Sequence, residues 1–437
     1  MSLRDKISSK SAHVGVIGLG YVGLPLAVTT ARAGFAVTGF DVDASKMDRL
    51  DAGKSYVEAV SDTDLGDVGD KLSWTTDFAH LRDCDVIVIC VPTPLTRHRE
   101  PDLSYVERTA EAIARHVTAD TLVALESTTW PGTTAEVMTP ILAQSGLTPG
   151  KDLFIGFSPE REDPGNATYR TKTIPKIVAG DGEAAGDLME AFYGAVVETV
   201  IRVPTTATAE AVKITENIFR AVNIALVNEL KLIYDKMGID VWGVIDGAAT
   251  KPFGYMPFYP GPGLGGHCIP IDPFYLTWRA REFGVPTRFI ELAGEINTNM
   301  PAHVIDRLRE ILDRAWGRGL NGAKILLVGV AYKKNVSDMR ESPSMRLMQL
   351  LEEAGAEVEF LDPHVPALPP MREYGQFEAR RAIAPQAIGT GDFDAVLIAT
   401  DHDAIDYDAL LTLGCPVIDT RNAIARRGLA MDNVTKV

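Results

Sequence analysis

A glycine-rich turn near the N-terminus constrains the fold of this chain more than any other feature. The segment VGVIGLGYVGLPLA places Gly18, Gly20 and Gly23 in a G-x-G-x-x-G pattern, with Tyr21 and Val22 inside it. The first glycine permits a tight turn, the second lets the backbone approach a pyrophosphate, and the third packs a helix against a strand. The pattern predicts strand, turn and helix, with an anion at the helix N-terminus.

An acidic residue after the second apolar run supports this interpretation. FAVTGFDVD places Asp41 where a carboxylate accepts hydrogen bonds from a ribose diol and repels a 2′-phosphate. The acid favours NAD over NADP, although the basic residues Arg32 and Lys46 leave NADP open. A glycine turn without any cofactor is the alternative, and the combination of strand, helix and acid disfavours it.

Short β-branched runs alternate with helical stretches at both ends of the chain. From residue 12 to about 203 the runs are AHVGVIGLG, GFAVTGFD, CDVIVICVP, TLVALES, FIGFSP, KIVAG and VETVIRVP. Near-continuously apolar strands of this kind predict a parallel sheet covered by helices on both faces. The alternation restarts near residue 323 with AKILLVGVAY, AEVEFLDP, DAVLIATD and CPVIDTRNA, without the glycine signature of the first half.

The middle of the chain is helical. Residues 205–237 lack proline and keep apolar residues at three-to-four spacing, which predicts one long helix, and more helix follows to about 316. We therefore predict an α/β protein of two Rossmann-like doubly wound domains joined by a long central helix and helical region. The predicted boundaries are 1–204 for the cofactor domain, 205–317 for the central region and 318–437 for the second α/β domain.

Composition narrows the possible partners. The net charge of −16 disfavours nucleic acid and anionic membranes, and no apolar run approaches the length of a membrane span. The N-terminus lacks the apolar core of a secretory signal, so we expect a cytoplasmic protein. The four cysteines, Cys84, Cys90, Cys268 and Cys415, form no C-x-x-C pair, which predicts reduced thiols and neither disulfides nor zinc.

One of these cysteines lies in an unusual loop, GPGLGGHCIP, residues 261–270. Cys268 can be a buried packing residue, a metal ligand or a nucleophile. Its neighbour His267 disfavours a shared metal, since adjacent side chains rarely face one ion, so we expect none. A nucleophilic thiol beside an NAD site can trap an aldehyde as a thiohemiacetal, lose a hydride to give a thioester, and release an acid on hydrolysis.

Such chemistry requires groups that stabilise an oxyanion and a carboxylate that handles protons. Lys213 and Asn217 are four residues apart on the long helix and share one face, and Asp272 follows the cysteine by four residues. The alternative is that Lys213 and Asn217 form a solvated helix face.

Seven motifs in order carry a resemblance to a known family. They are GLGYVGLPLA, VPTPL at 91–95, ESTTWPGTT at 126–134, SPER at 158–161, AEAVKITENIFRAVNIALVNE at 209–229, GPGLGGHCIPIDP at 261–273 and VAYKKNVSDMRESPS at 330–344. Together they resemble the UDP-glucose/GDP-mannose dehydrogenase family over essentially the whole chain. The resemblance implies oxidation of the C6 alcohol of a UDP-sugar to a carboxylate with two molecules of NAD, in a homodimer that serves polysaccharide biosynthesis.

The resemblance also implies residue roles. Cys268 is similar to the family's nucleophile, Lys213 and Asn217 to its oxyanion partners, and Asp272 and Glu160 to the carboxylates that handle protons and water, with Thr128 holding that water. The cofactor contacts implied, besides the glycine turn and Asp41, are Thr93, Thr128 and Arg340. The substrate contacts implied are Glu160, Lys213, Asn217, Gly265, Gly266, Tyr332, Lys333 and Arg421.

Departures from the UDP-glucose pattern indicate the sugar. UDP-glucose enzymes usually have Ser before the cysteine and Lys before the aspartate, where this chain has His267 and Ile271. The form GGHCIPIDPFYLTW resembles the branch that acts on UDP-N-acetylhexosamines, which favours UDP-N-acetylglucosamine, with UDP-N-acetylmannosamine as the alternative. A two-electron β-hydroxyacid dehydrogenase or a non-catalytic nucleotide-sugar sensor is a remoter alternative.

Overall fold

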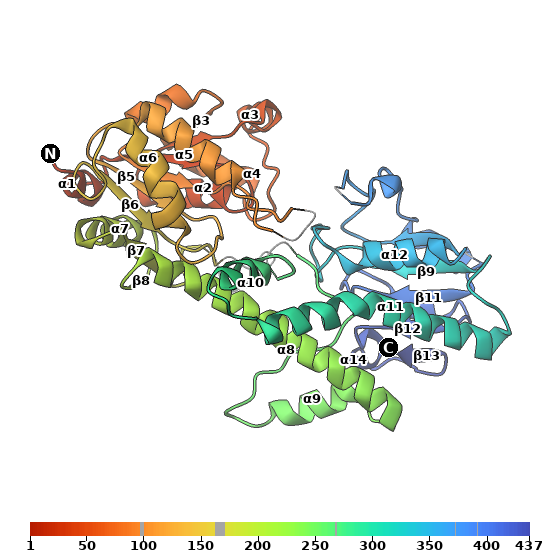
Figure 1. Cartoon of the computed structure of the whole chain (residues 1–437). Helices are drawn as coiled ribbons and strands as arrows, with labels where there is room; N and C mark the ends of the chain where they lie inside the picture. The colour runs from red at the N-terminus through yellow and green to blue at the C-terminus, as the bar shows by residue number, and fades with distance from the viewer. Residues whose placement is uncertain (97–99, 162–170, 267–268, 372, 391) are drawn as a thin grey trace. The chain divides into compact units, whose positions relative to one another are not determined.

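The computed structural model describes the chain except for residues 97–99, 162–170, 267–268, 372 and 391. It forms two compact units (Figure 1). The first comprises Met1–Glu216 and Phe274–Val285, and the second comprises Asn217–Pro273 and Pro286–Val437. The domain boundaries at 204/205 and 317/318 stay predictions.

The first unit contains an eight-stranded sheet in the order β3-β2-β1-β4-β5-β6-β7-β8. All neighbouring strands are parallel except β6 and β7, whose antiparallel pairing departs from the fully parallel sheet that the sequence predicted. The order of the first six strands is that of a Rossmann fold, whose ligands bind beyond the carboxyl ends of the strands where the order reverses, here at β1 and β4. The strands are β1 His13–Ile17, β2 Ala36–Phe40, β3 Leu72–Thr75, β4 Val86–Ile89, β5 Thr121–Leu125, β6 Leu153–Phe157, β7 Lys176–Gly180 and β8 Val200–Arg202.

Helices cover this sheet and bury its apolar residues. Helices α2 and α7 pack directly on the strands, and their apolar residues join those of β1 and β4 in one core. The helices are α1 Leu3–Ser8, α2 Gly23–Ala33, α3 Ala44–Asp51, α4 Asp62–Val68, α5 Ser104–His116, α6 Thr139–Leu142 and α7 Glu183–Val196, with shorter turns η1 Gly69–Lys71, η2 Phe78–Asp83, η3 Thr134–Met138 and η4 Ala143–Ser145.

The second unit contains a five-stranded parallel sheet in the order β10-β9-β11-β12-β13, another doubly wound order. Its strands are β9 Lys324–Val328, β10 Glu357–Leu361, β11 Ala395–Ile398, β12 Val417–Asp419 and β13 Val434–Lys436. Alternate residues of β9 face different cores: Ile325 and Leu327 pack in one, and Leu326 and Val328 in the other. A strand buried on both faces explains the continuous apolar run ILLV at residues 325–328.

The remaining helices complete the structure. They are α8 Thr206–Met237, α9 Val241–Ala249, α10 Asp272–Glu282, α11 Arg288–Trp316, α12 Pro343–Glu353, α13 Tyr407–Leu411 and α14 Ala423–Arg426, with turns η5 Gly375–Phe377 and η6 Pro385–Thr390. Helix α11 packs on α12, and α12 packs on β10. The structure confirms the predicted fold: two Rossmann-like domains and a helical middle region that begins with one long helix.

Three elements differ from the sequence prediction. Helix α1 was not predicted from the mostly polar residues before the first strand; it forms because Ser2 and Asp5 form a capping box and Leu3 and Ile7 are buried. Strands β3 and β13 were not predicted, because they are short and their residues are mostly half-buried, with a weak apolar pattern. Within the described residues, no helix is both long and apolar enough for a membrane span.

Candidate active site

The glycine turn joins β1 to α2 as the sequence predicts. Gly18 has φ +91°, and a Cβ there would stand 2.7 Å from the carbonyl oxygen of Cys90. A Cβ on Gly23 would collide with the carbonyl oxygen of Gly18. Around Gly20, by contrast, no described atom lies within 4 Å of the Cβ position. Packing therefore requires the first and third glycines, whereas the second leaves open space beside the turn for a ligand.

Asp41 follows β2 and lies against this turn. Its Oδ2 accepts hydrogen bonds from the Leu19 N–H (2.9 Å) and from Lys46 Nζ (2.6 Å). Arg32 is held instead by Asp64, with Arg32 NH2 2.5 Å from Asp64 Oδ1. Both basic residues that left NADP open thus have acidic partners. The role of Asp41 in binding the ribose stays a prediction.

Thr93 and Thr128 follow β4 and β5, two neighbouring strands whose carboxyl ends lie at the same sheet edge as the glycine turn. Thr93 is buried, and its carbonyl oxygen accepts a hydrogen bond from the Tyr275 hydroxyl (2.7 Å). Thr128 is half-buried, two residues beyond Glu126. The buried Glu126 carboxylate accepts hydrogen bonds from Lys176 Nζ (2.7 Å) and from the Tyr193 hydroxyl (2.6 Å). This charged cluster fixes the start of the turn that carries Thr128.

The other end of that turn is held by Glu210 of α8. Its carboxylate accepts from the N–H groups of Gly132 (2.5 Å) and Thr134 (2.9 Å) and from the Thr134 hydroxyl (2.7 Å). Burial raises the pKa of Glu210 to about 7, against the three donors that lower it. Sequence reasoning missed Glu210, Glu126, Lys176 and Tyr193, because their partners are distant in the chain.

Lys213 and Glu160 form an ion pair in the first unit. Lys213 Nζ lies 3.2 Å from Glu160 Oε2, and the two side chains are 7% and 12% exposed. Next to them in the chain, Arg161 NH2 pairs with Glu216 Oε1 at 2.6 Å. A nearly buried ammonium is costly unless paired, so the Glu160 carboxylate compensates the burial of this lysine.

Asn217 and Asp272 form a second buried pair, in the second unit. Asn217 Nδ2 donates to Asp272 Oδ2 at 2.6 Å, and the two residues are 4% and 2% exposed. Asp272 begins α10, the helix that follows the glycine loop. The burial of Lys213 and Asn217 excludes the solvated helix face as an interpretation of α8 at these positions.

The glycine loop packs against three predicted substrate or cofactor residues of the second unit. A Cβ on Gly265 would stand 2.5 Å from Tyr332 Cβ, and the Gly266 N–H donates to the Arg340 carbonyl oxygen (2.9 Å). Arg421 lies against Gly261, whose missing side chain leaves room for the guanidinium. Lys333 is half-buried beside Tyr332. His267 and Cys268 lie outside the described residues.

The three other cysteines are unsuited to nucleophilic chemistry. Burial raises the pKa of Cys84 to about 12, that of Cys415 to about 11, and that of Cys90 well above the usual thiol value. Because the thiolate is the nucleophile, such groups are inert near neutral pH. If a cysteine acts in this protein, Cys268 is the remaining candidate.

Comparison with known proteins decides the family. Three models of the UDP-glucose/GDP-mannose dehydrogenase family match: the NAD binding domain at residues 12–197, the central domain at 207–299 and the UDP binding domain at 326–426. The chain belongs to the UDP-glucose/GDP-mannose dehydrogenase family. It is therefore an NAD-dependent oxidoreductase with a UDP-sugar-binding domain.

Relatives in this family carry names with different sugars. The chain is 36% identical to a UDP-N-acetyl-D-glucosamine 6-dehydrogenase of Pseudomonas aeruginosa, over 90% of this chain and 91% of the relative. It is 35% identical to a UDP-N-acetyl-D-mannosamine dehydrogenase of Pyrococcus horikoshii, over 89% of each. A solved structure of the UDP-D-ManNAc dehydrogenase from P. horikoshii has a TM-score of 0.87 at 32% identity, covering 97% of this chain and 99% of that one. Identity alone does not separate the two sugars.

The position of Asp41 in the NAD binding domain predicts a change of cofactor preference. In Asp41→Ser, we expect the ratio of kcat/KM for NAD to that for NADP to fall at least tenfold, since hydrogen bonds to charged groups contribute about 1.5–3 kcal/mol. Lys46, freed of its partner, then meets the 2′-phosphate. The matched control is Asp43→Ser, which keeps an N-cap for α3 and leaves the ratio unchanged. An unchanged ratio in Asp41→Ser would show that this acid does not select NAD.

Proposed function

We propose that this dehydrogenase oxidises the C6 alcohol of UDP-N-acetylglucosamine to the uronic acid in two steps. The observation that supports the chemistry is the pair of buried contacts made by α8, from Lys213 to Glu160 and from Asn217 to Asp272. Each joins a group able to stabilise an oxyanion to a carboxylate able to accept a proton. A nucleotide-sugar sensor is disfavoured because the chain keeps the cysteine, the lysine, the asparagine and both carboxylates that the chemistry requires.

The residue roles in the proposed reaction follow from this chemistry. NAD, when bound, accepts a hydride from C6 in each of the two oxidations. Cys268 Sγ adds to the C6 aldehyde and forms a thiohemiacetal, which becomes a thioester after the second oxidation; water then releases the carboxylate and the free thiol. Lys213 and Asn217 stabilise the oxyanion at each tetrahedral stage. Asp272 and Glu160 take up protons, and Thr128 holds the hydrolytic water.

The nucleotide and cofactor contacts belong to the same proposal. Gly18, Gly20, Tyr21, Val22 and Gly23 hold the pyrophosphate of NAD, with Asp41 on its ribose and Thr93, Thr128 and Arg340 as further contacts. Gly265, Gly266, Tyr332, Lys333 and Arg421 bind the UDP-sugar, together with the pairs on α8. The product is an activated uronic acid of the kind that polysaccharide biosynthesis consumes.

The choice of sugar rests on the loop sequence. Ile271, which is 8% exposed, replaces the lysine of UDP-glucose enzymes and adds no charge before Asp272. The P. aeruginosa relative named for UDP-N-acetyl-D-glucosamine supports the same sugar, and the P. horikoshii relative supports UDP-N-acetylmannosamine as the second candidate.

A panel of four UDP-sugars tests the substrate. We expect kcat/KM to be higher for UDP-N-acetylglucosamine than for UDP-N-acetylmannosamine, UDP-N-acetylgalactosamine or UDP-glucose. If kcat/KM is highest for UDP-N-acetylmannosamine, that sugar becomes the proposed substrate and the proposed reaction is unchanged. Turnover of UDP-glucose alone would contradict the proposed sugar, and turnover of none would favour a nucleotide-sugar sensor.

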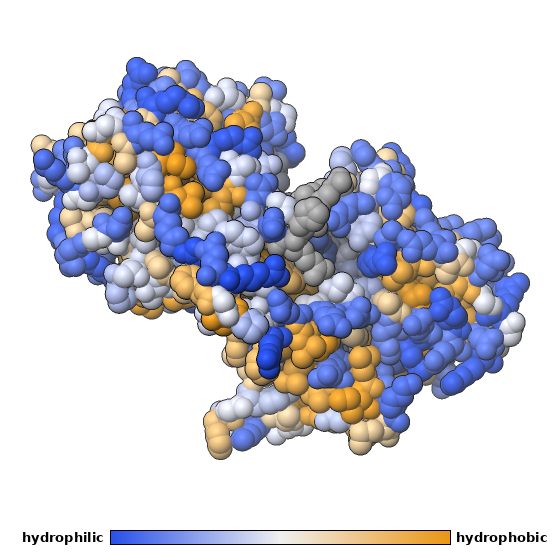
Figure 2. Space-filling view, in the orientation of Figure 1, coloured by the Kyte–Doolittle hydropathy of each residue, from blue (hydrophilic) through white to orange (hydrophobic). Residues whose placement is uncertain are grey.

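We also propose a homodimer formed through α8. Phe219, Leu226 and Ile233 recur every seven residues on this helix and are 49%, 49% and 47% exposed. Figure 2 shows further hydrophobic surface on this helical region. Exposed apolar residues on one helical face mark an interface.

We expect the Leu226→Asp variant to sediment as a monomer, because a charge is introduced into the proposed interface. The control variant Lys236→Asp changes an exposed residue of the same helix, and we expect it to remain a dimer. If both variants sediment as dimers, the interface lies elsewhere.

A further inference from the structure

The turn after the first strand of the second unit has the same geometry as the glycine turn of the NAD binding domain, and an aspartate lies beside each turn. In both units the glycine after the first strand, Gly18 or Gly329, has a positive φ, +91° or +80°. Its N–H donates to the last residue of the adjacent strand, at 2.7 and 2.8 Å. An aspartate follows that strand, Asp41 in one unit and Asp362 in the other, and accepts from the N–H next to the glycine. Asp362 is thus the counterpart of the ribose-binding acid.

Asp362 has no capacity left for a ribose. Its Oδ2 accepts from the N–H groups of Val330 (2.7 Å) and Ala331 (3.1 Å) and from His402 Nε2 (3.0 Å), and its Oδ1 accepts from the N–H groups of His364 (2.8 Å) and Val365 (3.1 Å). Its side chain is 0% exposed. Burial opposes ionisation, but the His402 and backbone donors hold the pKa of Asp362 below its usual value.

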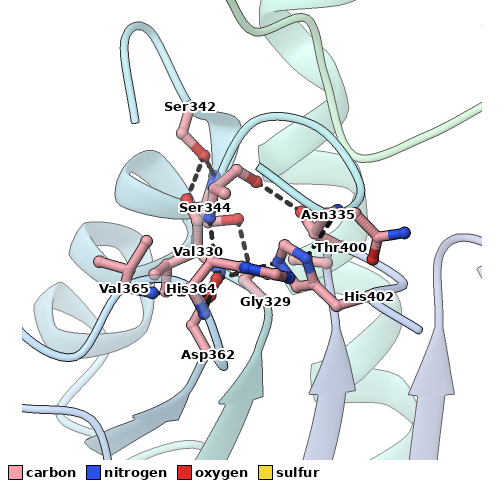
Figure 3. Close-up of polar contacts among 12 residues, drawn as sticks. Gly329, Val330, Asn335, Ser342, Ser344, Asp362, His364, Val365, Thr400 and His402 are labelled. Carbon is pink, nitrogen blue, oxygen red and sulfur yellow. Dashed lines mark hydrogen bonds and ion pairs between the residues drawn. The ribbon is translucent and has the colours of Figure 1, made fainter. Parts of the chain in front are cut away.

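His402 joins this carboxylate to a loop. The Asn335 N–H donates to His402 Nδ1 at 2.9 Å, so Nε2 carries the proton of the neutral ring and donates to Asp362. The ring is fully buried and lies against His364, with 4.9 Å between the ring centroids. These contacts select one tautomer and one orientation of His402 (Figure 3).

The loop that His402 holds runs from Val330 to Glu341 and carries Tyr332, Lys333 and Arg340. Two further hydrogen bonds fix its ends: the Thr400 hydroxyl donates to the Ala331 carbonyl oxygen (2.6 Å), and the Ser342 hydroxyl to that of Val330 (2.7 Å). From outside, the Asn335 side-chain amide donates to Asp403 Oδ2 (2.7 Å) and accepts from the Asp403 backbone N–H (2.9 Å). The loop is therefore anchored by these hydrogen bonds in addition to its apolar residues Val330, Ala331, Val336 and Met339, which are buried in a core of the second unit.

The same loop supports the glycine segment before Cys268. The Tyr332 side chain stands where Cβ atoms of Gly265 and Gly266 would lie, and the Arg340 carbonyl oxygen receives the Gly266 N–H. A displacement of the loop at Asn335 therefore has two effects. It moves the residues proposed to bind UDP, and it moves Tyr332 and Arg340, which contact the glycine segment.

We propose that Asp362 and His402 are positioning residues for UDP-sugar binding, which fix the loop 330–341 from the position that Asp41 occupies in the NAD binding domain. This rests on the proposed function insofar as Tyr332, Lys333 and Arg421 bind the UDP-sugar. Neither Asp362 nor His402 touches the substrate; each acts through the backbone of the loop.

Two substitutions of His402 separate its two hydrogen bonds. His402→Asn keeps an acceptor near the Nδ1 position for the Asn335 N–H, and His402→Gln keeps a donor near the Nε2 position for Asp362. We expect the Kd for UDP, measured by titration calorimetry, to rise about tenfold in His402→Gln, the order expected for one lost hydrogen bond, and less than about threefold in His402→Asn. We expect the Kd for NAD to rise less than the Kd for UDP in both variants, because Arg340 is the one proposed NAD contact on this loop.

The matched control is Tyr407→Phe. It removes a buried hydrogen bond to the carbonyl oxygen of His402 (3.1 Å) but leaves both imidazole contacts, so we expect wild-type affinity for UDP. Wild-type affinity for UDP in His402→Gln would overturn the positioning role. Equal losses of UDP affinity in both His402 variants, together with a lowered Tm in both, would also overturn it. If neither variant folds, Asn335→Gly loosens the loop from outside at a residue with φ +60°. We expect weaker UDP binding there as well, and an unchanged Kd would again overturn the proposal.

UDP alone serves as the probe, which separates this inference from the proposed function. If wild-type protein binds UDP but oxidises none of the four UDP-sugars, the proposed reaction fails while the His402 comparison stands. If the sugars are oxidised and the His402 variants bind UDP normally, the positioning role fails alone.

Discussion

Cys268→Ser is expected to stop formation of the uronic acid while UDP-sugar binding persists. A serine hydroxyl is far less nucleophilic than a thiolate, so the covalent intermediate does not form, and we expect acid formation to fall by on the order of 10³-fold or more. The measurement is the initial rate of carboxylate production, followed by mass spectrometry, beside the Kd of the UDP-sugar.

The control for this variant is Cys415→Ala. Cys415 is buried in a core of the second unit, and burial raises its thiol pKa to about 11, so its loss removes a thiol without removing a nucleophile. We expect normal turnover by the folded protein. Acid production at the normal rate in Cys268→Ser would remove the nucleophile assignment.

The second large effect is expected at Lys213. Lys213→Met keeps much of the buried volume and removes the ammonium that pairs with Glu160. Loss of one donor to a developing oxyanion typically costs about 10²–10³ in kcat, and we expect that loss here. Because the interaction strengthens in the transition state, KM for the UDP-sugar changes much less than kcat.

Lys236→Met on the same helix is the matched control. Lys236 is exposed in the last turn of α8, so its substitution removes an equal charge without touching the ion pair. We expect wild-type kinetics. If Lys213→Met instead raises KM and leaves kcat within threefold of the wild type, the lysine binds the ground state and does not stabilise the oxyanion.

The sequence predicted the fold well because the strands of both sheets are buried on two faces. Runs such as VIVI and KILLV have no polar alternation, which distinguishes them from amphipathic helices. Strands β3 and β13 lack this signal because they are short and only partly buried. Gly329, the counterpart of Gly18, went unnoticed because the other two glycines of the pattern are replaced by Ala331 and Lys334.

The candidate site was predictable only where its spacing is local. The four-residue spacing of Lys213 and Asn217 and the short distance from Cys268 to Asp272 are visible in the sequence. The partners of buried charges are not, since Lys176 meets Glu126 across fifty residues and His402 meets Asp362 across forty. Such contacts depend on strand order, which no local pattern reports.

The stoichiometry of the reaction tests the central proposal most directly. Purified protein is supplied with a limiting, known amount of UDP-N-acetylglucosamine and excess NAD, and NADH is measured by absorbance at completion. A four-electron oxidation through Cys268 predicts two NADH for each sugar and a carboxylate as the only product. One NADH for each sugar with an aldehyde or ketone product would contradict it.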